Sequence, residues 1–139
     1  MKRLRVLLPL VLVVVLVAIA VAGYWLKRPS EAVPVACADP LAGCSFSHRG
    51  TPVAVRFSAR PAPLEAFGLS VRAPDAARVS ADFQMVGMDM GFYRYDLRRA
   101  QDGSWASSVT LPVCVSGQRD WVLYLDVDGV RYALPFSTR

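Results

Sequence analysis

The chain has 139 residues, 54% of them hydrophobic, and a formal net charge of +5. Five of its sixteen basic residues lie within positions 1–28, which leaves eleven basic and eleven acidic side chains in the remainder. Without a net basic charge, that remainder is not expected to bind nucleic acid, which needs basic residues clustered on a folded face. Its roughly 110 residues suffice for one domain with a modest core.

An uncharged stretch of 21 residues, 6–26, lies between two short basic segments. Because about 20 apolar residues span the roughly 30 Å hydrocarbon core of a bilayer, residues 1–28 are predicted to form a single membrane anchor. The A-x-A sequence at 20–22 leaves a cleaved signal peptide as the alternative, although the apolar stretch is longer than a signal peptide usually has. More basic residues precede this stretch than follow it, so we expect a cytoplasmic N-terminus and an exported C-terminal part.

Residues 29–44 are predicted to form a tether that contains a cysteine loop, CADPLAGC. In an oxidising compartment, the three cysteines Cys37, Cys44 and Cys114 predict one disulfide and one remaining thiol. A local bond between Cys37 and Cys44 and a bond from either of them to Cys114 are both compatible with the sequence. The absence of a C-x-x-C or C-x-x-x-C motif argues against dithiol exchange.

Residues 45–139 show the alternation of apolar and polar residues that is typical of strands, interrupted by turn signals such as Asp102-Gly103 and Asp128-Gly129. No amphipathic helix is expected after the anchor. We therefore predict an all-β domain, an immunoglobulin-like antiparallel β-sandwich of about seven strands. The alternating runs lie at residues 53–57, 67–71, 79–85, 92–97, 105–111, 121–127 and 130–136.

Apart from the initiator, every methionine lies in the segment MVGMDMG, at Met85, Met88 and Met90. Thioethers are soft ligands that suit Cu(I), so this cluster predicts a copper(I) site in an exported domain. Gly87 would mark a bulge that brings Met85 to the same side as the other two. The alternative is that the methionines fill gaps in the core.

His48 is the only histidine in the chain and would complete such a site if its strand lies near residue 88. Otherwise it is an ordinary surface or edge residue. A single histidine without a nucleophile motif, and aspartates without a spacing suited to acid–base catalysis, indicate that the protein is not an enzyme.

The anchor, the small β-sandwich, the M-x-M-G sequence at 88–91 and the W-x-L-x-L sequence at 121–125 together resemble the FixH/YtkA-like periplasmic proteins. The resemblance implies a single-pass protein of the bacterial inner membrane with a periplasmic domain. It further implies copper delivery during assembly of respiratory cytochrome oxidases, with Met88 and Met90 at the matched positions and a copper-acceptor protein as partner. The alternative is an interaction subunit without metal that docks on a membrane protein complex.

Overall fold

The computed structural model describes residues 2–27, 31–88, 90–91, 93–113 and 115–139, and it divides the chain into two units between residues 30 and 31. The first unit holds one helix, α1 (Lys2–Leu26). Within it, residues 7–26 have a mean hydropathy of 2.8, and this is the one helix in the described part of the chain that is long and apolar enough to cross a membrane. The prediction of a single N-terminal apolar helix is confirmed.

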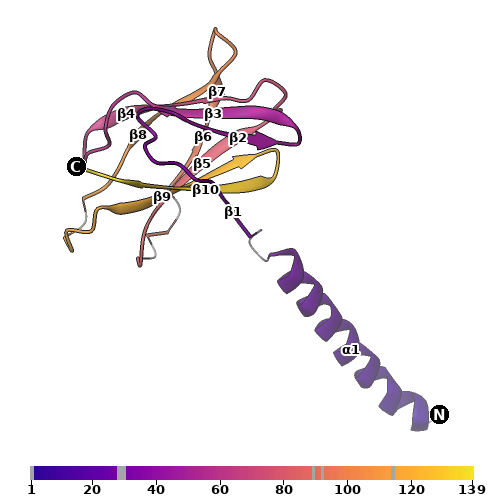
Figure 1. The fold of residues 1–139 in the computed structure, drawn as a ribbon. Helices are drawn as coiled ribbons and strands as arrows, with labels where there is room; N and C mark the ends of the chain where they lie inside the picture. Colours follow the sequence, from indigo (N-terminus) through magenta and orange to yellow (C-terminus); the bar gives the residue numbers. More distant parts are fainter. Residues whose placement is uncertain (1, 28–30, 89, 92, 114) are drawn as a thin grey trace. The chain divides into compact units, whose positions relative to one another are not determined.

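The second unit is a β-sandwich of two five-stranded sheets (Figure 1). In the first sheet, called sheet I below, the strand order is β1-β10-β9-β5-β6. In the second, sheet II, the order is β2-β3-β4-β8-β7. Sheet I consists of β1 (Val33–Pro34), β5 (Val79–Met85), β6 (Arg94–Asp96), β9 (Asp120–Val127) and β10 (Val130–Ser137). Sheet II consists of β2 (Cys44–His48), β3 (Thr51–Phe57), β4 (Ala66–Arg72), β7 (Arg98–Arg99) and β8 (Trp105–Thr110).

The connections follow the immunoglobulin pattern. Strands β3, β4, β8 and β7 take the places of strands A, B, E and D, and β5, β9 and β10 take those of C, F and G. The predicted immunoglobulin-like sandwich is therefore confirmed, although the described residues form ten strands where the sequence predicted about seven, because short edge strands join both sheets. Its pairing is antiparallel except at one edge, where Val33 and Pro34 pair in parallel with Tyr132 and Ala133.

The core lies between the sheets because each long strand turns alternate side chains inward. In β9, for example, Trp121, Leu123, Leu125 and Val127 are at most 2% exposed while the residues between them are half-buried. Aromatic rings fill the centre of the sandwich and contact one another at centroid distances of 5.1–6.1 Å. These rings belong to Phe57, Phe67, Phe83 and Phe136.

The hairpin turns predicted at Asp102-Gly103 and Asp128-Gly129 are both present in the structure. Asp128 and Gly129 have φ angles of 49° and 86°, the left-handed pair that a type I′ hairpin requires. The Asp128 carboxylate also accepts hydrogen bonds from the backbone of Ala77 and Arg78, at 3.0 and 2.8 Å, and so ties this turn to the loop before β5. At the other turn, hydrogen bonds from Ser104 hold the pKa of Asp102 below its usual value.

A disulfide joins Cys37 and Cys44, whose Cα atoms lie 5.5 Å apart, within the range that a disulfide normally spans. Of the pairings that the sequence left open, the structure therefore has the local one. The bond closes the segment that leads from the end of β1 to the start of β2. Cys114 lies outside the described residues.

Candidate functional site at one end of the sandwich

The three methionines lie at the end of the sandwich where β5, β8 and β10 finish. Residue pairing puts Met85 of β5 opposite Trp121, which in turn pairs with Phe136 near the end of β10. The loops that follow β3, β5 and β8 lie at this same end. We call it the methionine end, and the opposite end, which carries the Asp128–Gly129 turn, the His48 end.

Met85 and Met88 have different environments. Met85, the last residue of β5, is 3% exposed and packs in the core. The bulge that was predicted to bring its side chain to the side of Met88 and Met90 is therefore not formed. The chain then reverses: the Met88 amide donates to the Met85 carbonyl at 3.3 Å, and Gly87 has a φ of 80°. Met88 is 42% exposed at this turn. The turn therefore presents one thioether outward and holds another inward.

Met90 is half-buried against the edge of the core, two residues beyond Met88. Asp89, between them, lies outside the described residues. Gly91 follows with a φ of 72°, so a second left-handed glycine redirects the chain within five residues of Gly87. Met88 and Met90 are thus the two thioethers that this loop keeps at or near the surface.

His48 lies at the opposite end. Its ring contacts Tyr132, which pairs with Leu125 and, through it, with Ala81. Ala81 precedes Met85 by four residues, or about 13 Å along a strand, and Met88 lies further on. The structure therefore does not bring His48 together with Met88 and Met90.

His48 is buried and hydrogen-bonded to Tyr132. The side chain is 7% exposed, and its Nδ1 lies 2.7 Å from the Tyr132 hydroxyl, with which it shares a hydrogen bond. Its Nε2 is buried and has no hydrogen-bond partner. Neither ring nitrogen is presented to solvent, so His48 serves the packing of β2 against β10 rather than an open metal site.

The burial of Tyr132 makes stability depend on pH. Burial raises the pKa of Tyr132, and nearby Arg49 opposes that shift. The folded chain thus keeps the phenol proton to higher pH than the unfolded chain, whose tyrosines titrate near pH 10, so this stabilisation is present below about pH 10 and lost above it. Tyr132→Phe should cost about 1–3 kcal/mol at neutral pH because it leaves buried His48 unpaired. Urea unfolding at pH 7 and pH 10.5 should show this difference shrinking at high pH; a constant difference would contradict the account.

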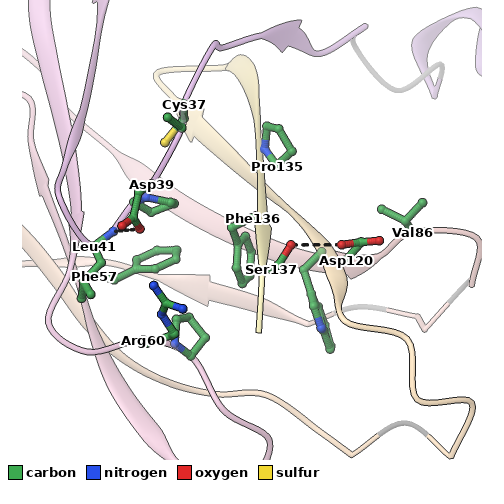
Figure 2. A pocket seen from close by; sticks show the side chains of 14 residues that line it. Cys37, Asp39, Leu41, Phe57, Arg60, Val86, Asp120, Pro135, Phe136 and Ser137 are labelled. Atoms are coloured by element: carbon green, nitrogen blue, oxygen red, sulfur yellow. Dashed lines mark hydrogen bonds between the residues drawn. The ribbon is translucent and has the colours of Figure 1, made fainter. Parts of the chain in front are cut away.

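A groove of about 510 Å³ lies at the methionine end beside the Met85–Met88 turn (Figure 2). In Figure 2, Cys37, Asp39 and Leu41 lie on one side of it and Val86 and Asp120 on the other. The Val86 amide donates to the Asp120 carbonyl at 3.0 Å, which joins the methionine loop to the start of β9. The disulfide loop and the methionine loop therefore border one groove although they are far apart in sequence.

Charged side chains in the groove are few and mostly engaged. Asp39 accepts a hydrogen bond from the Leu41 amide at 3.0 Å, and Asp120 accepts one from the Ser137 hydroxyl at 3.0 Å. Arg60 also lines the groove. Within the described ranges, no three His, Cys, Asp or Glu side chains gather in a way that could hold a metal ion. Met88 and Met90 are the soft candidate ligands at this end of the sandwich, and Asp39 and Asp120 are hard oxygen groups that suit Cu(I) poorly.

Apolar side chains are also exposed at the methionine end. Leu64, Val86 and Val113 are 70%, 50% and 56% exposed, and Val115 is fully exposed. They come from the three loops that follow β3, β5 and β8. This grouping could not be predicted from the sequence, because each residue is a single apolar side chain in a turn and only the fold places the loops at one end.

Comparison of the chain with protein-family models, with curated proteins and with solved structures gives no match. The fold itself defines the class: an immunoglobulin-like β-sandwich preceded by one helix able to span a membrane. The resemblance to the FixH/YtkA-like proteins stays a prediction that rests on the short motifs at 88–91 and 121–125.

Proposed function

We propose that the chain is a membrane-anchored accessory protein that binds Cu(I) through the thioethers of Met88 and Met90 and passes it to an acceptor protein. The observation that carries the proposal is the presentation of these two side chains on one tight loop: Met88 is exposed and Met90 is half-buried beside it. Met85, which points into the core, is left out of the site.

The chemistry suits a carrier. Cu(I) prefers soft ligands, and a thioether binds it without losing a proton, so binding should persist at acid pH, where thiolate sites weaken. Two protein ligands leave coordination positions open for the ligands of an acceptor, which allows transfer by ligand exchange. With an exported C-terminal domain, α1 would hold this loop on the periplasmic side of the inner membrane, near complexes such as the respiratory oxidases that the resemblance implies.

An anaerobic Cu(I) titration against a competing chelator tests the proposal on the full-length protein in detergent. The wild type should bind one Cu(I), and Met88→Ile/Met90→Ile should lose at least about tenfold in affinity, because isoleucine keeps the apolar bulk but has no sulfur. Met85→Leu is the matched control and should bind as the wild type does, since Met85 is 3% exposed. Equal binding by the wild type and the double variant would rule out these ligands.

The exposed apolar residues of the methionine end favour a second candidate function, an interaction subunit that contacts a protein of a membrane complex. Leu64 and Val113 are more than half exposed at this end. Apolar side chains that are grouped on a surface mark sites of contact with other proteins. Met88→Ile/Met90→Ile separates the two functions because it removes copper ligands and keeps an apolar surface. A variant that loses Cu(I) and still supports assembly of the partner complex would favour the interaction subunit.

A further inference from the structure

The two sheets carry opposite charge. The five strands of sheet II contain four arginines and no acidic residue, whereas those of sheet I contain four aspartates and two arginines. The domain as a whole is close to neutral, so this difference is a segregation of charge across the sandwich. The arginines of sheet II are Arg56, Arg72, Arg98 and Arg99; the charged residues of sheet I are Asp82, Asp96, Asp120, Asp126, Arg94 and Arg131.

Three of the four arginines of sheet II lie on its outer face. Arg56, Arg72 and Arg98 are exposed on this face, while Arg99, although also exposed, lies over the Trp105 ring and donates to the Ala76 carbonyl at 2.6 Å. Pairing places Arg56 opposite Ser70, Ser70 opposite Ala106, and Ala106 opposite Arg98. Two guanidinium groups therefore flank a low stretch of small side chains in one row across the sheet.

Among the described residues, the exposed guanidinium groups of sheet II form no ion pair, whereas those of sheet I do. On sheet I, Arg131 pairs with Asp82 at 3.0 Å and Arg94 with Asp96 at 3.7 Å. On the outer face of sheet II, Arg56 donates to the Ala42 carbonyl at 3.3 Å, an uncharged acceptor. Arg72 has an acidic neighbour in Asp102, in the turn before β8, whose charge interacts with it although the two form no ion pair among the described residues.

From this asymmetry we propose that the outer face of sheet II lies on the anionic headgroups of the bilayer that holds α1. Only six residues, 27–32, separate Leu26 from Val33, a length of at most about 25 Å, so a charged face on the domain acts at a high effective concentration of lipid. Arginine side chains near an anionic surface are attracted to it, and the attraction falls off within a Debye length. The acidic outer face of sheet I is repelled by the same surface.

A fluorescent label reports on this contact in nanodiscs that contain full-length protein and lipid with a headgroup quencher. In a Cys114→Ser background, the label is placed at Ser108→Cys on the outer face of sheet II or at Gln84→Cys on sheet I. With 30% anionic lipid the label at 108 should be quenched at least about threefold more than in zwitterionic lipid, and 0.5 M salt should abolish the difference. The label at 84 should show no such increase.

Arg56→Gln/Arg72→Gln/Arg98→Gln should remove the lipid-dependent quenching at position 108. The matched control is Arg78→Gln/Arg94→Gln/Arg119→Gln, which loses the same charge from exposed sites elsewhere and should quench as the wild type does. Equal quenching in both lipids, or equal loss in both triple variants, would overturn the proposal. If the face instead binds an acidic protein, the label will not be quenched in these protein-free bilayers, and the proposal likewise fails.

Discussion

Phe83→Ala should lower the free energy of unfolding by about 3–5 kcal/mol. Phe83 is 0% exposed in the middle of β5, and its ring meets those of Phe67, Tyr95 and Phe136 edge to face at centroid distances of 5.9–6.1 Å. Alanine would leave a cavity between the two sheets that the surrounding rings cannot fill. Since domains of this size are stable by only about 5–15 kcal/mol, much of the population should unfold in mild denaturant.

Chemical denaturation followed by near-UV circular dichroism measures this loss. Val115→Ala is the control, because Val115 is fully exposed and its truncation should change stability by less than about 0.5 kcal/mol. A loss below about 1 kcal/mol for Phe83→Ala would mean that the aromatic cluster does not form the centre of the core.

Cys37→Ser/Cys44→Ser should cost about 2–3 kcal/mol of stability. The chain-entropy relation gives this value for a loop with a sequence separation of 7. Because Cys44 is also the first residue of β2, loss of the bond should loosen the start of that strand as well as the wall of the groove at residues 37–41. Denaturation midpoints of the wild type and the variant provide the measurement.

A reducing agent supplies the matched control for the disulfide. Added to the wild type, it should reproduce the loss seen in the double serine variant, and added to that variant it should change nothing further. Cys114→Ser should keep the stabilisation because the Cys37–Cys44 bond remains. If Cys114→Ser removes it as well, the pairing of Cys37 with Cys44 is wrong.

The fold was predictable because the long strands bury one face. The alternation of Trp121, Leu123 and Leu125 has a period of two that only a strand satisfies, and the hairpin residues Asp128 and Gly129 fix the register of β9 and β10. The short edge strands β1 and β7 could not be predicted in this way. Two residues carry no period, and their pairing depends on which neighbour the folded sheet leaves available.

The candidate site was predictable only in part. The clustering of Met88 and Met90 is a property of the sequence, and the exposed turn that carries them follows from Gly87. The place of His48 was not predictable, because it depends on how β2 packs against Tyr132 of the opposite sheet. The groove likewise combines the loop at 37–41 with the end of β10, segments that only tertiary packing brings together.

The central claim is that Met88 and Met90, and not Met85, bind Cu(I). Two-dimensional NMR of the full-length protein labelled with ¹³C at the methionine methyl groups follows each thioether separately during an anaerobic Cu(I) titration. We expect the Met88 and Met90 signals to shift together and to saturate at one equivalent, while the Met85 signal, from a side chain 3% exposed, stays in place. If the Met88 and Met90 signals do not move, or if Met85 shifts as they do, the claim is contradicted.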